Sequence, residues 1–231
     1  MLALIQARMS SRRLPGKVLA EVGGRPLLCY LIERLQHCRL LSEVAIATSE
    51  NPSDDPVATF AARWQVRLFR GSLDDVLLRF VSAAQFFGVN SFVRVNGDSP
   101  LLDPALVDYG VSLFDDADLD LVTNVHPRSF PKGQSVEVVA VDALRRAATE
   151  SREQEDREHV TRYIYNNPGR FRIMNFACDQ DLSQMRLSVD TPGDLATFRW
   201  LIGAMTRPHW EYAVGELSQM AVSAGSLGEA W

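Results

Sequence analysis

The side chains best suited to chemistry form a cationic loop close to the start of the chain. Residues 6–17 read Q-A-R-M-S-S-R-R-L-P-G-K and combine four basic side chains with two serines and a glycine. Such a loop offers charge, hydroxyls and closely spaced backbone N–H groups, the donors that bind phosphate oxygens. It contains neither the P-loop pattern nor the Rossmann fingerprint. The loop predicts a polyphosphate site, although these residues alone equally suit a solvated basic turn.

Two aspartates, Asp98 and Asp190, each follow a short apolar strand pattern and have no evident structural task. The helix start that comes after each is already explained by another residue, Asp103 in one case and Thr191 in the other. Two such carboxylates at strand ends could converge on one hard divalent cation such as Mg²⁺, with phosphate oxygens and water as further ligands. For Asp98 the alternative is a turn residue of the Asx type.

Strand and helix patterns alternate along the chain, which predicts an α/β fold with a doubly wound, mostly parallel sheet. The cationic loop follows the apolar run Leu2–Ile5, which is typical of a central parallel strand, and ligands bind at the carboxyl ends of such strands. No linker or repeat is visible, so residues 1–231 are expected to form a single domain with a projecting β excursion at about 125–141. Further strands are expected at 43–48, 65–69, 91–95, 119–124, 135–141, 171–177 and 186–189, and helices at 26–38, 56–64, 72–87, 104–114, 151–167 and from 192.

The composition argues against several classes of protein. A net charge of −5 over 231 residues does not suit a general nucleic-acid binder, so the cationic loop needs an anionic ligand of its own. The three cysteines form no C-x-x-C pair and are expected as reduced thiols. No apolar run approaches the ~18 residues of a membrane span. No basic leader precedes Leu2, and we therefore expect a cytoplasmic protein without a membrane partner.

The loop and the two aspartates resemble the signatures of the sugar-activating cytidylyltransferases, the acylneuraminate and 3-deoxy-manno-octulosonate type, which join acidic sugars to CMP. The matching stretches are A-R-M-S-S-R-R-L-P-G-K, G-D-S-P and V-D-T-P-G-D-L, in the family's order. The resemblance implies a nucleotide-diphospho-sugar transferase-like fold, CTP and an acidic sugar as substrates, and a Mg²⁺ cofactor. It implies Arg8, Lys17, Asp98 and Asp190 as catalytic, with the two aspartates as metal ligands. The residues implied for nucleotide binding are Ala7, Arg8, Ser10, Ser11, Arg12, Lys17 and Arg70, although Arg70 equally suits a surface turn.

The segment at 125–141 is implied by the resemblance to line the sugar pocket and to form a homodimer contact. Gln134 and Glu137 become candidate substrate contacts by their position, although Glu137 equally suits a strand residue that faces water. His159 joins them from D-R-E-H-V-T, which matches the spore-coat polysaccharide biosynthesis protein F branch, although a lone histidine is more often structural.

The chain departs from that branch at three positions, which bear on the choice of sugar. Lys132 and Ser135 stand where the branch usually has Asp, and Arg162 stands where it usually has Pro. A lost carboxylate and a gained cation are expected to change which sugar fits.

The sequence therefore predicts a Mg²⁺-dependent cytidylyltransferase that forms a CMP-sugar and pyrophosphate for surface polysaccharide or glycan biosynthesis. One alternative is a glycosyltransferase that uses a ready-made nucleotide sugar, which ordinarily needs a D-x-D metal motif. The stretch Asp118–Asp120 has that form but begins a strand rather than ending one. The other alternative is a non-catalytic nucleotide-binding protein, which Lys132 and Ser135 keep open. No residue identifies the base or a general base.

Overall fold

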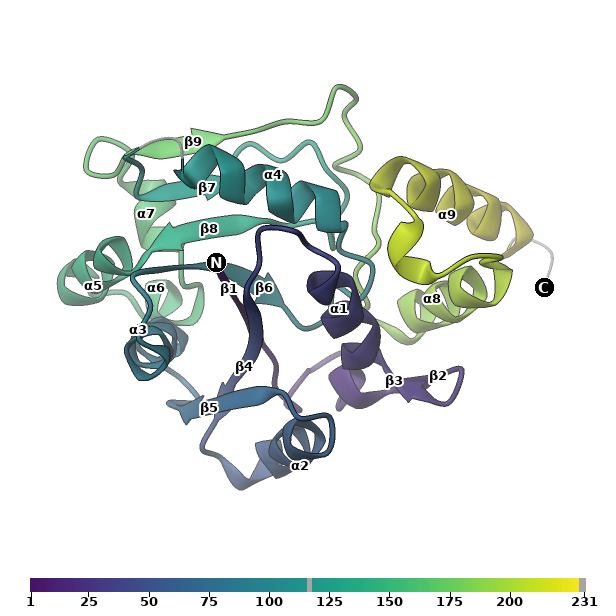
Figure 1. Ribbon diagram of the computed structural model, residues 1–231, viewed down its shortest axis with the longest axis horizontal. Coiled ribbons are helices and arrows are strands. Elements are labelled where there is room, and N and C mark those ends of the chain that lie inside the picture. The colour runs from purple at the N-terminus through teal and green to yellow at the C-terminus, as the bar shows by residue number, and fades with distance from the viewer. Residues whose placement is uncertain (116–117, 229–231) are drawn as a thin grey trace.

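A seven-stranded, mostly parallel sheet runs through the centre of the molecule (Figure 1). The computed structural model describes residues 1–115 and 118–228. Neighbouring strands are parallel except around the fifth strand of the order, which lies antiparallel to both its neighbours. The order across the sheet is β5 (Arg67–Gly71), β4 (Glu43–Ser49), β1 (Leu2–Gln6), β6 (Ser91–Asn96), β8 (Glu137–Ala140), β7 (Leu121–Thr123) and β9 (Ile173–Asn175).

Helices cover both faces of this sheet, as the predicted doubly wound fold requires. One face is covered by α1 (Leu27–Gln36), α2 (Asp55–Arg63) and α4 (Pro104–Asp115), and the other by α3 (Val76–Phe87), α5 (Val141–Glu150), α6 (Gln154–Glu158) and α7 (Arg162–Asn166). A side lobe contains α8 (Pro192–Ala204) and α9 (Val214–Gly228), which pack on each other beside the hairpin of β2 (Glu21–Val22) and β3 (Arg25–Pro26) (Figure 1). Short 3-10 turns occur at η1 (Lys17–Leu19), η2 (Pro52–Asp54) and η3 (His209–Glu211).

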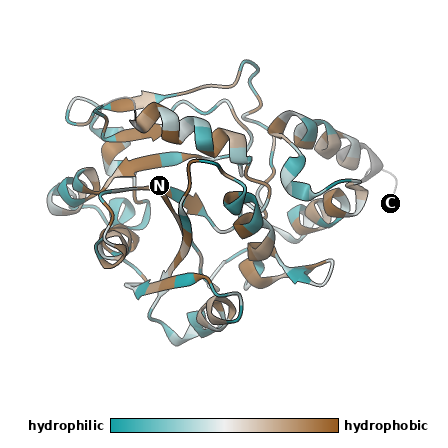
Figure 2. Ribbon diagram, in the orientation of Figure 1, coloured by the Kyte–Doolittle hydropathy of each residue, from teal (hydrophilic) through white to brown (hydrophobic). Residues whose placement is uncertain are grey.

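The strand β1 lies between helices on both faces of the sheet, which explains why its sequence is apolar without alternation. Ala3 and Ile5 pack into the core under α1, whereas Leu2 and Leu4 pack into the core under α3. Successive side chains of a strand point to opposite faces, so a strand with helices on both sides is apolar at every position. Figure 2 shows hydrophobic colouring over part of β7 and β8 as well, although β8 begins with the charged but buried Glu137. Within residues 1–115 and 118–228, no helix is both long enough and apolar enough to cross a membrane.

The strand predicted at 186–189 is wrong, because this segment runs along a loop rather than beside a strand. Leu187 N donates to the Lys132 carbonyl at 2.7 Å, and Val189 N donates to the Asp98 carbonyl at 2.9 Å. Gly133 permits the close approach: it has a φ of +97°, and a Cβ atom there would lie 2.5 Å from the Ser188 nitrogen. The extended segment thus carries Asp190 to the end of β6 without joining the sheet.

The segment at 125–141 leaves the sheet only over its first part. Its turn-rich portion contains an isolated bridge between Val125 and Arg128, after which the chain returns as β8 in the interior of the main sheet. Two further differences follow along the chain. The helix α5 has no counterpart among the predicted elements, and the single helix predicted at 151–167 is divided into α6 and α7.

Candidate active site

A cavity of about 810 Å³ opens at the carboxyl ends of β1 and β6. The two strands are neighbours in the sheet. After β1 the chain continues to β4 and β5 on one side, whereas after β6 it continues to β7 and β8 on the other side. Open α/β sheets bind ligands at the point where the strand order reverses in this way. Gly97 N donates to the Gln6 carbonyl at 2.8 Å, and a Cβ atom at Gly97 would lie 2.8 Å from that oxygen. Nine residues singled out in the sequence line the cavity: Arg8, Ser10, Ser11, Arg12, Arg13, Lys17, Asp98, His159 and Asp190.

The cationic loop is held from beneath by Asp54, which is fully buried. One oxygen of its carboxylate accepts from Met9 N at 2.7 Å, and the other accepts from the Ser49 hydroxyl. Gly16, in the left-handed conformation, donates its N–H to the Met9 carbonyl at 2.9 Å and closes the loop. Sequence reasoning missed Asp54, because the backbone N–H that it binds lies 45 residues away along the chain. The structure places the N-cap at Asp54, whose side chain binds the loop instead of the helix.

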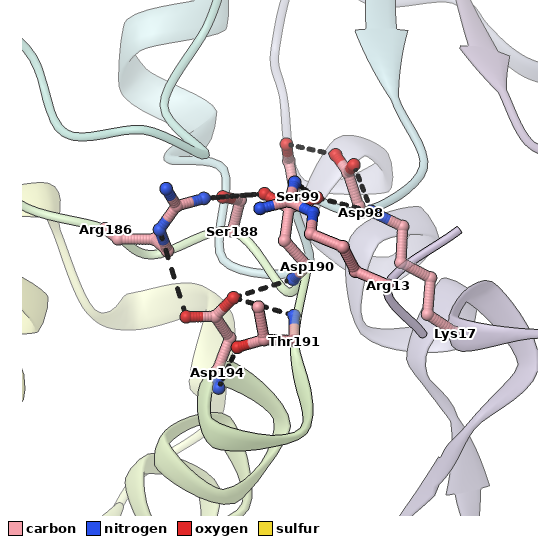
Figure 3. A network of polar contacts seen from close by, with 9 residues as sticks. All are labelled: Arg13, Lys17, Asp98, Ser99, Arg186, Ser188, Asp190, Thr191 and Asp194. Carbon is pink, nitrogen blue, oxygen red and sulfur yellow. Dashed lines mark hydrogen bonds and ion pairs between the residues drawn. The ribbon is translucent and has the colours of Figure 1, made fainter. Parts of the chain in front are cut away.

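Lys17 links the loop to both aspartates (Figure 3). Its ammonium donates to Asp98 Oδ2 at 2.6 Å and to Asp190 Oδ1 at 2.8 Å, and its side chain is only 10% exposed. Arg8, by contrast, lines the same cavity and pairs with Glu158 at 3.5 Å. The expected meeting of the loop and the two carboxylates at one edge of the sheet is therefore observed.

Asp190 is oriented by its own helix start and by further cations. The Asp194 carboxylate accepts from the backbone N–H groups of Asp190 and Thr191, both at 2.9 Å, and Thr191 Oγ1 accepts from Asp194 N to complete a capping box. Arg186 donates to Asp190 Oδ2 at 2.6 Å, and Arg13 lies 2.9 Å from Oδ1 (Figure 3). The cap leaves the Asp190 side chain free for the cavity, as the sequence predicted.

These cations make Asp190 a source of pH-dependent stability. Burial alone would raise the pKa of its carboxyl, but the hydrogen bond from Lys17 and the charges of Lys17, Arg13 and Arg186 together lower this pKa. A group with a lowered pKa stabilises the fold above its unfolded-state pKa of about 3.9, and this contribution is lost as the pH falls through the folded-state value. We expect Asp190→Asn to lower the free energy of unfolding at pH 7, and the difference from the wild type to shrink below about pH 4. Urea denaturation across that range measures it, and a difference that stays constant with pH would contradict the assignment.

Asp98 and Asp190 are the side chains that could hold a magnesium ion together with a substrate. Within the described parts of the chain, no group of three or more His, Cys, Asp or Glu side chains could hold a metal by itself. Mg²⁺ commonly takes one or two protein carboxylates and completes its shell with phosphate oxygens and water. Asp98 and Asp190, joined by the Lys17 ammonium, supply that incomplete set of oxygens.

A second cavity of about 390 Å³ adjoins the first, since Asn96 and His159 line both. Glu137 lines it but is 4% exposed, so the alternative of a strand residue facing water is wrong. Its carboxylate pairs with Arg94 and accepts from the hydroxyls of Thr161 and Tyr165, each at 2.6 Å. Burial would raise the pKa of Glu137, but the Arg94 charge and these hydrogen bonds lower it. Glu137 is thus an ionised group that organises the wall of this cavity.

Gln134 lies in the protein interior, and the prediction that it contacts the sugar is corrected. Its amide is fully buried, with Nε2 donating to the Leu101 carbonyl at 2.7 Å and Oε1 accepting from Asp103 N at 2.9 Å. Both ends of the side chain are therefore used to hold the loop between β6 and α4. Sequence reasoning could not see this, because both partners are backbone atoms.

Replacing Gln134 by leucine is expected to lower the free energy of unfolding by on the order of 3 kcal/mol, because a buried N–H and a buried carbonyl lose their partners. Urea denaturation measures the change. The matched control is Gln85→Leu on the exposed side of α3. Equal losses in the two variants would show that the Gln134 contacts contribute nothing.

Two residues expected at the nucleotide lie outside the cavity lining. Arg70 donates to the backbone carbonyls of Ser49 and Asn51, at 2.9 and 3.1 Å, and pairs with Asp55 at 2.8 Å. These contacts connect β5 to the turn before α2, so Arg70 has the structural role at a turn that the sequence also allowed. Ala7 is buried at the end of β1.

The D-x-D stretch lies at the wrong end of the sheet for a metal site beside Asp98. Leu121 is level with Phe92 through their shared neighbour Val139, so Asp120 lies near the start of β6, whereas Asp98 follows its end. Asp118 pairs with Arg172, and Asp120 pairs with Arg146 and accepts from Arg172 N at 2.8 Å. Both carboxylates thus have structural partners.

The three departures from the branch pattern fall in different places. Ser135 and Arg162 line the second cavity. Lys132 is exposed, and its backbone N–H donates to the Met185 carbonyl at 2.9 Å.

Comparisons with known proteins agree with this geometry. A family model described as cytidylyltransferase matches residues 2–202. The chain is 34% identical over 210 residues to spore coat polysaccharide biosynthesis protein SpsF of Bacillus subtilis, covering 87% of this chain and 85% of that protein. It is 34% identical over 110 residues to 3-deoxy-manno-octulosonate cytidylyltransferase of Geobacter sulfurreducens, covering 48% of this chain and 43% of that protein. A solved cytidylyltransferase from Leptospira borgpetersenii superimposes with a TM-score of 0.91 at 30% identity, covering 97% and 94% of the two chains.

Proposed function

The chain belongs to the cytidylyltransferase family, and from this premise we propose that it joins CTP to an acidic sugar, giving a CMP-sugar and pyrophosphate for polysaccharide or glycan biosynthesis. The observation that carries the proposal is the Lys17 ammonium between Asp98 and Asp190, inside a cavity lined by the cationic loop. Anion donors and carboxylates at one sheet edge suit a nucleoside triphosphate with its metal ion.

In the proposed reaction, the two substrates occupy the two adjoining cavities. A hydroxyl oxygen of the sugar forms a bond to the α-phosphorus and loses its proton to solvent, and the bond from that phosphorus to the departing pyrophosphate breaks. Lys17 and Arg8 stabilise the charge on the leaving group, and the loop backbone positions the triphosphate. His159 lines both cavities, and the proposal therefore assigns it a position beside the sugar hydroxyl and the α-phosphate.

We assign the cofactor role to Mg²⁺, with Asp98 and Asp190 as the residues that would hold it. When bound, the ion would neutralise charge on the triphosphate. Addition of EDTA is expected to stop turnover, and an excess of MgCl₂ is expected to restore it.

The proposal is tested with the pure protein, each of the four nucleoside triphosphates, MgCl₂ and a panel of acidic and neutral sugars, with pyrophosphate as the readout. Release that requires both CTP and an acidic sugar is the expected result. Release of a nucleoside diphosphate from a ready-made nucleotide sugar would support a glycosyltransferase instead. Binding of CTP without release of pyrophosphate from any sugar would support a non-catalytic protein.

Two further features stay proposals. We place the reaction in the cytoplasm, a location that suits the three unpaired cysteine thiols. A homodimer with a contact through residues 125–141 is a prediction from the family resemblance, and sedimentation of the pure protein tests it.

A further inference from the structure

Asp54 stands at the N-cap position of α2, yet its carboxylate does not cap that helix. An aspartate at this position ordinarily accepts from backbone N–H groups in the first helical turn. Asp103, which precedes α4, does so, since its Oδ1 accepts from Ala105 N at 2.9 Å. The Asp54 carboxylate instead accepts from Met9 N at 2.7 Å, 45 residues earlier in the chain. The side chain that could cap α2 therefore serves the cationic loop.

The contact between Asp54 and the loop is a strong one. Asp54 is fully buried, and its second oxygen accepts from the Ser49 hydroxyl. Hydrogen bonds to a carboxylate are roughly twice as strong as those between neutral groups, and a buried acceptor has no water to take the place of a lost donor. The charge of Asp54 also acts on a buried arginine of α3: burial and the Arg8 charge lower the pKa of Arg79 to about 10, whereas the Asp54 charge opposes this shift.

Met9 is the residue through which Asp54 fixes the loop. Its carbonyl accepts from Ser11 N and from Gly16 N, both at 2.9 Å, and its side chain packs against the core beneath α1. The peptide unit and the side chain of Met9 are thus held from below, while the residues on either side of it, Arg8 and Ser10, line the nucleotide cavity. Donors held in place before a ligand arrives bind it more tightly, because less freedom is lost on binding.

Resting on the function proposed above, we propose that Asp54 is a positioning residue that sets the affinity of the cavity for the triphosphate of the nucleotide. It acts through the Met9 peptide, which holds Arg8 and Ser10 in place, and being fully buried it does not itself contact a substrate. None of residues 7–17 lines the second cavity, so binding of the sugar there does not depend on Asp54.

The test compares Asp54→Ala with the matched control Asp103→Ala, using inorganic tripolyphosphate with MgCl₂ as the probe in calorimetry. Both variants remove a buried carboxylate that accepts two hydrogen bonds at the start of a helix, since Asp103 also accepts from Val214 N at 2.7 Å. Both are therefore expected to unfold at lower urea concentrations. The Kd for tripolyphosphate is expected to rise by about 10- to 100-fold in Asp54→Ala, and by less than about threefold in Asp103→Ala.

Two further readouts separate positioning of the loop from a general loss of stability. Hydrogen–deuterium exchange of the peptide over residues 7–17 in the free protein is expected to be faster in Asp54→Ala than in Asp103→Ala. Asp54→Asn is expected to recover most of the affinity, because its amide oxygen still accepts from Met9 N. If Asp54→Ala does not fold, Ser49→Ala removes only the donor to the second carboxylate oxygen, and the Kd is expected to rise by about threefold.

Equal Kd values for tripolyphosphate in Asp54→Ala and Asp103→Ala would overturn the role of Asp54, with nucleotidyl transfer still standing. A wild-type protein that does not bind tripolyphosphate would overturn it as well, because the loop would then not be a phosphate site. In turnover, KM for CTP should rise in Asp54→Ala while KM for the sugar stays near the wild-type value. If no sugar releases pyrophosphate, the proposed function fails, and the Kd for tripolyphosphate still decides whether Asp54 positions the loop.

Discussion

Asp98→Asn is expected to lower kcat/KM for pyrophosphate release on the order of a thousandfold. The substitution keeps the size of the side chain and removes the charge that contacts Lys17 at 2.6 Å. Loss of one group placed to stabilise transition-state charge costs about 10²- to 10³-fold in comparable sites, and loss of one of the two carboxylates proposed to hold Mg²⁺ belongs at the upper end of that range. Steady-state kinetics with CTP and the accepted sugar measure the loss.

The fold of this variant should be unchanged, because the Asp98 side chain is partly exposed and its hydrogen bonds within the described residues go to the side chains of Lys17 and Ser99. Urea denaturation checks that expectation. Asp142→Asn, on the exposed surface of α5, removes the same charge far from the cavity and is the matched control. Turnover of Asp98→Asn within tenfold of this control would rule out the assigned role of Asp98.

Lys17→Met is expected to lower kcat/KM by about 100- to 1000-fold, since it removes a charge placed to meet the departing pyrophosphate. Methionine preserves most of the buried apolar stem, so the loss reports the ammonium rather than the packing. The same variant removes the positive charge shared by Asp98 and Asp190. The free protein should therefore bind Mn²⁺ more tightly than the wild type, which electron paramagnetic resonance of the unbound ion measures.

Arg13→Gln serves as the control for Lys17. Arg13 contacts the same oxygen of Asp190, but its side chain is 58% exposed, and exposed ion pairs contribute little. Arg13→Gln is expected to lower kcat/KM by less than about tenfold. Equal losses in the two variants, or unchanged Mn²⁺ binding by Lys17→Met, would show that the buried position of Lys17 has no special role.

The parts of the site that sequence could predict are those governed by local rules. A strand of the first few residues, the polar loop after it, and helix caps at Asp103 and Thr191 each follow from short patterns, and the structure contains all of them. Asp98 and Asp190 could be singled out because their neighbours already explained the helix starts. For Asp98, which follows β6, the parallel sheet then gives the position at its carboxyl edge, whereas Asp190 reaches the same place on a segment outside the sheet.

The parts that sequence could not predict depend on contacts between distant backbone atoms. Gln134, Asp54 and Arg70 each bind main-chain groups of another segment, and main-chain groups carry no sequence signal. The segment before Asp190 has the composition of a strand, yet its backbone partners are a loop residue and the Asp98 carbonyl. Tertiary context overrides the local preference for pairing in a sheet there.

The bridge made by Lys17 has a consequence for how the protein is made. Its three members are separated by 81 and 173 residues along the chain, counted from Lys17. A ribosome that has delivered the first half has produced the loop and Asp98 but not Asp190, and long-range contacts of this kind form late in folding. A polypeptide interrupted before the last fifth of its message is therefore without the second carboxylate altogether, and under the proposed function we expect such an incomplete product to be inert rather than partly active.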